Sequence, residues 1–244
     1  MKEKPSPIRP TDANAIALAR HLLRVARFGA LATLDPGDGL PQVTRVAVAT
    51  DHDAAPLLLI SDLAAHTRAL ADNPACALLL GEPGKGDPLA HPRLSVKATA
   101  QRVDEADVTK LRRRYLARHP KAALYVEFAD FAFYRLEPVS ALLNAGFGKA
   151  YELTRDDLLL SVPEGFAEME CHLRAEIGHE ELLAILPDHS RSTGDRWHIG
   201  TIDPEGIVLV SGDKVVRVTF PTPVPIATDL PQMIATFCKR ADRT

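Results

Sequence analysis

Apolar positions along residues 28–136 follow the short periods of β-strands. Residues 57–60 (LLLI) form a continuous apolar run of the length expected for a strand buried on both faces. Further strands, in which apolar positions alternate or cluster between turn residues, are predicted at 28–34, 42–50, 75–80, 93–103 and 128–136. Closely connected strands of this kind predict an antiparallel meander, and such a meander hides its edges by closing into a barrel.

Helical spacing of apolar residues interrupts the strands in three places. Thr11 is the expected cap of a first helix, whose apolar face lies within 16–26, and Asp104 is the expected cap of another helix. A short helix is predicted to begin near His66 and to end at Asn73, because a proline follows and disfavours the helical conformation.

The pattern changes near Tyr151, where the strands give way to helical spacing that continues to about residue 186. Three short strands and a final helix follow, at 197–202, 207–211, 215–220 and 230–240. The predicted class is therefore α+β: a split β-barrel of antiparallel strands with flanking helices, then a small α+β domain. The expected division is a flexible tail over 1–10, the barrel domain over 11–150, and the small domain over 151–244.

The step from the buried strand to the short helix predicts an anion site. Ser61 ends the strand, and His66, Thr67 and Arg68 begin the helix, where free backbone N–H groups and the helix dipole favour negative charge. Arg45 lies on the preceding strand, and antiparallel pairing brings it near Ser61. An inward Arg45 needs an anionic partner. An ordinary capped connection with an outward Arg45 fits the same pattern, and both interpretations remain open.

Composition and charge exclude several classes of function. The chain has 244 residues and a net charge of −3, which gives no field that would recruit nucleic acid or an acidic membrane surface. No apolar run approaches the length of a membrane span. The three cysteines, Cys76, Cys171 and Cys238, are far apart and odd in number, which predicts reduced thiols in a cytoplasmic protein.

The C-terminal histidines are the other candidates for chemistry. His172 and His179 are seven positions apart and share a helix face if that helix is unbroken, and His189 and His198 follow. Metal binding needs tighter spacing and carboxylates aimed at the same point, so we expect no metal site. A haem axial ligand needs only one histidine, whereas a purely structural role for each remains the alternative.

Three segments carry a resemblance to a known family: 26–49 (ARFGALATLDPGDGLPQVTRVAVA), 56–80 (PLLLISDLAAHTRALADNPACALLL) and 86–103 (GDPLAHPRLSVKATAQRV). They resemble the FMN-binding split-barrel family typified by pyridoxamine 5′-phosphate oxidase. Residues 60–70, 114–138 and 145–153 are similar to the haem-utilisation branch of that family, and 200–224 are similar to the small domain that follows the barrel there. The resemblance implies a homodimer with ligand sites at the subunit interface. The FMN-binding positions that it implies are Arg45, Val46, Ile60, Ser61, His66, Thr67 and Arg68.

The function expected from this resemblance is an FMN-binding oxidoreductase whose substrate the sequence does not identify. The oxidase's C-terminal arginine and histidine signature is not visible, so pyridoxamine phosphate is not the expected substrate. One alternative is a haem-binding or haem-degrading protein, with His172 and His179 as candidate ligands. Another is a non-catalytic regulatory dimer with a degenerate pocket. No catalytic residue is assigned.

Overall fold

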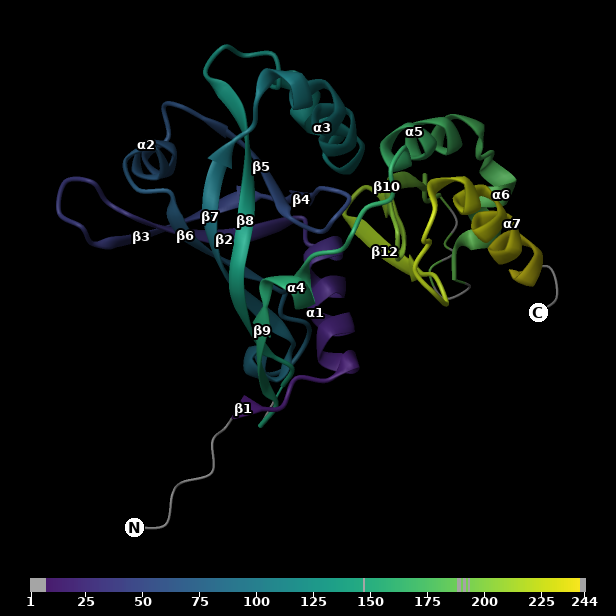
Figure 1. The fold of residues 1–244 in the computed structure, drawn as a ribbon, viewed down its shortest axis with the longest axis horizontal. Coiled ribbons are helices and arrows are strands. Elements are labelled where there is room, and N and C mark those ends of the chain that lie inside the picture. Colours follow the sequence, from purple (N-terminus) through teal and green to yellow (C-terminus); the bar gives the residue numbers. More distant parts are fainter. Residues whose placement is uncertain (1–7, 147, 188–189, 191, 193, 242–244) are drawn as a thin grey trace, which may run out of the picture.

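The chain folds around two β-sheets (Figure 1). The computed structural model describes residues 8–146, 148–187, 190, 192 and 194–241. The strands of the larger sheet are β1 Ile8–Arg9, β2 Phe28–Leu34, β3 Pro41–Ala47, β4 Ala49–Thr50, β5 Pro56–Ser61, β6 Ala75–Leu80, β7 Arg93–Arg102, β8 Phe131–Asn144 and β9 Ala150–Thr154. The smaller sheet contains β10 His198–Asp203, β11 Gly206–Ser211 and β12 Lys214–Thr219.

The larger sheet closes into the split barrel that the sequence predicts. Its strand order is β1-β9-β8-β7-β6-β2-β3, and β5 pairs with β8 on one side and β4 on the other. Since β4 follows β3 directly in the chain, β5 completes the ring. The expected simple meander is wrong, because β6 pairs with β2 and β7, whereas β5 pairs with β8.

Strand β8 is longer than the sequence indicated. The expected strand ended at residue 136, but β8 runs for 14 residues through Pro138. Pro138 lies opposite Ala98 where the register of β7 shifts between Lys97 and Ala98. A β-bulge tolerates a proline that has no N–H to donate, so the strand continues past it.

The helices cover the barrel and build the C-terminal part. They are α1 Ala13–Val25, α2 Ala65–Asp72, α3 Glu105–Arg118, α4 Arg155–Leu158, α5 Phe166–Glu176, α6 His179–Ile185 and α7 Leu230–Ala241, with 3₁₀ turns η1 Pro88–Ala90, η2 Pro120–Leu124 and η4 Ala227–Asp229. Asp12, not Thr11 as predicted, caps α1: its Oδ1 accepts from Ala15 N at 2.8 Å. The Thr11 hydroxyl instead donates to the Glu152 carbonyl.

Three apolar clusters form the core. The first fills the barrel and includes α1, and the second lies between the outer side of β5 and α3. The third, around Phe166 and Trp197, belongs to the C-terminal part. Alternation along β5 explains the first two clusters, because Leu58 faces the barrel interior and Leu57 faces α3.

The C-terminal part follows the predicted order of helices, three antiparallel strands and a helix. Its helical stretch is broken, however, because α5 ends at Glu176 and Gly178 precedes α6. The Glu181 carboxylate accepts from Gly178 N at 2.9 Å and fixes this second start. None of the described helices is long and apolar enough to cross a membrane.

Candidate functional site

The first candidate site lies where β3, β5 and the start of α2 meet. Strand β4 pairs Ala49 with Leu57. Strand β3, which carries Arg45, pairs with β2 and also contacts β5. Arg45 is exposed there, and its guanidinium carbon lies 5.3 Å from the centroid of the Phe28 ring. Of the two orientations considered for Arg45, the structure has the outward one, and the side chain makes a cation–π contact.

Ser61 is already engaged by hydrogen bonds. Its hydroxyl donates to Asp130 Oδ2 at 2.5 Å and accepts from Leu63 N at 3.1 Å. Val46 and Ile60 are buried in the barrel core. Of these three predicted positions, Val46 and Ile60 can offer a ligand only their backbone, and Ser61 faces a carboxylate.

The start of α2 holds polar groups whose hydrogen-bonding capacity is unused. The N-cap residue is Ala64, which has no side-chain acceptor for the first N–H groups. Thr67 is 3 % exposed, and its Oγ1 is buried without a partner, as is Nε2 of His66. Burial lowers the pKa of His66 and favours the neutral ring. Arg68 is exposed and donates to the Leu63 carbonyl at 3.3 Å.

Two further unpartnered atoms belong to β2, which α2 packs against, and to its neighbour β3. Thr33 on β2 and Gln42 on β3 are cross-strand neighbours, and Thr33 Oγ1 and Gln42 Nε2 are both buried without a hydrogen bond. Helix α2 contacts β2 directly. Buried polar atoms are rarely left unsatisfied in native structures, so this corner of the barrel has the character of a ligand site.

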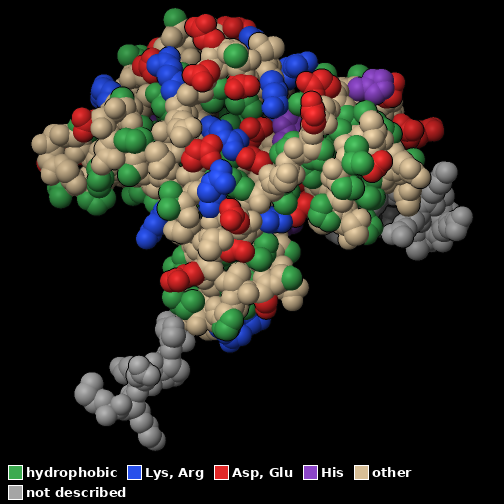
Figure 2. Space-filling model, in the orientation of Figure 1, with side chains coloured by type: hydrophobic (Ala, Val, Ile, Leu, Met, Phe, Trp, Pro, Cys, Tyr) green, Lys and Arg blue, Asp and Glu red, His purple; other side chains and the backbone are tan. Residues whose placement is uncertain are grey.

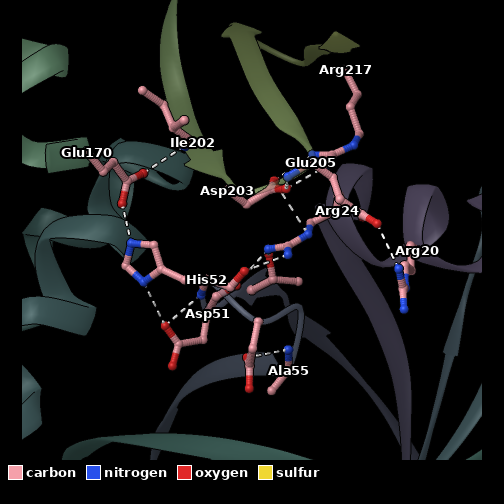
Figure 3. Close-up of polar contacts among 12 residues, drawn as sticks. Arg20, Arg24, Asp51, His52, Ala55, Glu170, Ile202, Asp203, Glu205 and Arg217 are labelled. Atoms are coloured by element: carbon pink, nitrogen blue, oxygen red, sulfur yellow. Dashed lines mark hydrogen bonds and ion pairs between the residues drawn. The ribbon is translucent and has the colours of Figure 1, made fainter. Parts of the chain in front are cut away.

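A second cluster joins the barrel to the C-terminal part, and sequence reasoning missed it (Figure 3). His52 lies in the turn between β4 and β5. Its Nε2 is 2.6 Å from Glu170 Oε2 on α5, and its Nδ1 is 3.1 Å from Asp51 Oδ1. The ring is 3 % exposed. In the sequence, residues 51–55 (DHDAA) indicate only a turn between two strands.

Arg114 on α3 binds the same carboxylate. Its Nη1 donates to Glu170 Oε1 and Oε2 at 2.7 and 2.8 Å and to the Ile202 carbonyl at 2.8 Å, while its Nε donates to the Thr50 carbonyl at 2.7 Å. Arg114 is 2 % exposed. In the sequence it ends a run of three arginines, Arg112 to Arg114, on a predicted helix, a pattern that indicates a solvated face.

Arg112 and Arg113 point in other directions than Arg114, because consecutive residues of a helix do not share a face. Arg112 pairs with Glu127, and Arg113 donates to Cys171 Sγ at 3.4 Å. Only the side chain at position 114 reaches the buried junction, so the expected solvated face holds for Arg112 and Arg113 alone.

Asp203, at the end of β10, is fully buried between two guanidinium groups. Arg217 donates to its two oxygens at 2.6 and 2.9 Å, and Arg24 Nε lies 3.5 Å away. Arg24 also donates to the Asp51 and His52 carbonyls, both at 2.7 Å. Burial raises the pKa of Asp203, but Arg24 and Arg217 outweigh it and lower the pKa to about 2.

This cluster is built to hold two parts of the chain together. Glu170 and Asp203 each lie against buried guanidinium groups, so neither is a free acid or base. Figure 2 shows acidic and basic side chains interleaved on the barrel, beside the C-terminal part on the right. A cleft of about 540 Å³ opens beside the cluster, with Asp51, Asp53 and Glu164 among its lining residues.

The predicted haem-ligand pair does not converge. His172 on α5 is exposed, 3.2 Å from Glu176, and His179 begins α6 beyond the break at Gly178. His179 and His198 line a hollow of about 300 Å³. His189 lies outside the described residues. Across the part of the chain that the structure describes, no group of three or more His, Cys, Asp or Glu could hold a metal ion.

Comparison with known proteins gives a family match. The sequence model of pyridoxamine 5′-phosphate oxidase matches residues 17–144. A chloroplastic heme oxygenase, HOZ, of Arabidopsis thaliana is 38 % identical over 115 residues, which are 47 % of this chain and 35 % of that protein. This chain therefore spans about a third of the length of the curated relative that it matches.

Solved structures extend the likeness to the C-terminal part. A protein of unknown function from Agrobacterium tumefaciens is 31 % identical, with a TM-score of 0.79 over 96 % of this chain and 100 % of that one. A heme binding protein from Mycobacterium smegmatis is 23 % identical, with a TM-score of 0.56 over 99 % of each chain. The latter likeness shows the fold alone.

Proposed function

The chain belongs to the pyridoxamine 5′-phosphate oxidase family, and on that premise we propose that it binds FMN at the start of α2 and acts as an oxidoreductase. Bound FMN supplies hydride-transfer and one-electron chemistry, and the protein supplies position and charge. The substrate is left open. The observation that carries this proposal is the pair of buried, unpartnered side-chain atoms at the start of α2, His66 Nε2 and Thr67 Oγ1.

A phosphate group fits this corner. The uncapped N–H groups of α2, the Thr67 hydroxyl and the helix dipole all favour an anion at the same point. Arg68, in the first turn of α2, and Arg45, on β3, are exposed cations, and among the described residues neither has a carboxylate partner. Ser61 takes another role, because Asp130 beside its hydroxyl repels phosphate.

A second copy of the chain completes the proposed site. The outer face of the barrel sheet exposes apolar side chains on neighbouring strands, including Val43 at 68 % and Leu79 at 45 %. The register connects them: Val43 lies opposite Ala32, and Leu79 lies between Ala30 and Ser95. A connected apolar face of this kind supports a homodimer. Arg45 lies on the same face, so the partner would border the cofactor.

The first experiment is an absorbance spectrum of the purified protein before and after addition of FMN. The proposal expects bound flavin with its two visible bands, and loss of flavin in Thr67→Ala and in Arg45→Ala. Arg155→Ala, at an exposed arginine of α4 far from α2 (Figure 1), is the matched control and retains flavin. Flavin content unchanged in both test variants rules out this assignment.

Haem is the second candidate, because the Arabidopsis relative is a heme oxygenase and is 38 % identical over nearly half of this chain. Titration with haemin then gives a saturable Soret band without flavin retention. Replacing His172 or His179 separately tests those ligands, and an unchanged band in both variants excludes them. Absence of both cofactors supports the regulatory dimer.

A further inference from the structure

A groove of about 460 Å³ is lined by residues of α3 on the barrel and of α5 on the C-terminal part. Figure 1 shows the two helices as neighbours across the junction. The walls of the groove come from the facing sides of the two helices, with Lys110 and Arg113 on one and Cys171 and Arg174 on the other. The buried His52, Arg114 and Glu170 form its floor. The groove is separate from α2 and from the proposed FMN site.

The groove is strongly cationic in a chain whose net charge is −3. Lys110, Arg113, Arg114 and Arg174 line it, and Glu170 is the single lining carboxylate. Arg114 and His52 already bind Glu170. Within the described ranges, no carboxylate pairs with Lys110, Arg113 or Arg174. Lys110, Arg113 and Arg174 therefore share one concave surface, and its single carboxylate is already bound by Arg114 and His52.

We propose that this groove binds a small organic anion that carries a phosphate group. Guanidinium groups bind phosphate oxygens through paired, charge-assisted hydrogen bonds, and Arg113 and Arg174 approach from opposite walls. Leu116, Ala167 and Ala175 provide apolar surface for the rest of the ligand.

The neighbouring cleft strengthens this choice of ligand. The two hollows share Lys110, His52 and Ala167, but the neighbouring one is lined by six carboxylates, including Asp104 and Asp107. Adjacent clefts of opposite charge steer an anion into the groove and away from the cleft. A bound anion contacts both α3 and α5 and so bridges the barrel and the C-terminal part.

Cys171 provides a built-in reporter for the test. It is an exposed free cysteine on the groove wall, with Arg113 Nη1 3.4 Å from its sulfur. A ligand held by Arg113 and Arg174 covers this sulfur. The rate of Cys171 alkylation by neutral iodoacetamide, followed by peptide mass spectrometry, therefore measures occupancy of the groove apart from the other cysteines.

The probe is pyrophosphate, titrated into the full-length protein at constant ionic strength. We expect saturable slowing of Cys171 alkylation, and roughly tenfold weaker protection in Arg113→Gln and in Arg174→Gln, which each remove a charge-assisted contact. Arg112→Gln is the matched control, because Arg112 directly precedes Arg113 on α3 but pairs with Glu127 outside the groove. That variant retains full protection.

Protection lost equally in Arg112→Gln, or reproduced by chloride at the same ionic strength, would show general screening and overturn the proposal. Absence of protection in the unmodified protein overturns it as well. The alkylation rate is independent of flavin or haem content, so this test does not depend on whether the proposed cofactor binds. Circular dichroism of each variant confirms that the fold is retained.

Discussion

His52 Nε2 and Glu170 Oε2 meet at 2.6 Å although 118 positions separate the two residues in the chain. One comes from a turn of the barrel and the other from the first long helix of the C-terminal part (Figure 3). Arg114 holds the same carboxylate from a third direction. The charge state of Glu170 is thus tied to the contact between the two parts.

We expect acid to weaken that contact in a defined pH range. Burial raises the pKa of Glu170, but Arg114 and His52 outweigh it and lower the pKa from 4.5 to about 2. The unfolded chain therefore takes up this proton first, so the contribution of Glu170 to stability is complete above pH 4.5 and is lost as pH falls toward 2. Urea unfolding across that range measures the loss.

Glu170→Gln should flatten that part of the pH dependence. At pH 7 it should also destabilise the protein by about 3–5 kcal/mol, since Arg114 stays buried without its counter-charge. Glu168→Gln, on the same helix, is the control. An unaltered acid profile in Glu170→Gln contradicts the assignment.

A second prediction concerns Asp203. Asp203→Asn removes the negative charge between Arg24 and Arg217, and we expect a loss of about 3–5 kcal/mol in the free energy of unfolding. Asp213→Asn is the comparison, because that side chain is 89 % exposed and pairs with Arg27 at the surface. Surface pairs of this kind contribute roughly 0–1 kcal/mol. Equal effects in thermal unfolding would contradict the role given to Asp203.

Thr67 is expected to favour ligand binding at the expense of stability. Its buried hydroxyl has no partner in the protein, so Thr67→Val, which keeps the shape of the side chain, should stabilise the cofactor-free protein by about 1 kcal/mol. The same variant should bind FMN more weakly. Thermal unfolding and flavin titration measure the two effects. A variant that is less stable and binds FMN normally would show that the hydroxyl serves the fold.

The proposed homodimer predicts a difference between two exposed apolar residues. Val43→Asp places a charge on the outer sheet face and should shift the protein from dimer to monomer in analytical ultracentrifugation. Leu124→Asp should leave the mass unchanged, because Leu124 is 78 % exposed on the turn after α3. A monomeric unmodified protein, or a dimer that survives Val43→Asp, counts against the sheet face as the interface.

The local pattern of apolar and turn residues predicted individual strands and turns well. The strands at 28–34 and 75–80 were predicted with the bounds that the structure has. The predicted strand ended too early, because Pro138 signals an end unless the bulge at Val139 of β8 is known. Pairing partners were harder to predict, since the choice between β6 and β8 as the neighbour of β5 depends on ring closure and not on any local residue.

The junction between the two parts could not be predicted from local residue patterns. Arg114 lies in a run of three arginines that reads as a helix surface, and Asp51 and His52 lie in a cluster that reads as a turn. Their partners Glu170 and Asp203 are far along the chain. The break at Gly178 was also missed, because a single glycine within a run rich in Glu, Ala and Leu does not show whether a helix continues past it.

Because of the ion pairs between them, the barrel and the C-terminal part must evolve together. Arg24 and Arg114 are buried on the barrel side and bind Asp203 and Glu170 on the other. A gene fusion that transplants the barrel alone leaves both guanidinium groups without their carboxylates. Recombination can exchange the two parts only as a matched pair. Although the chain has separate apolar clusters, calorimetry should record one melting event.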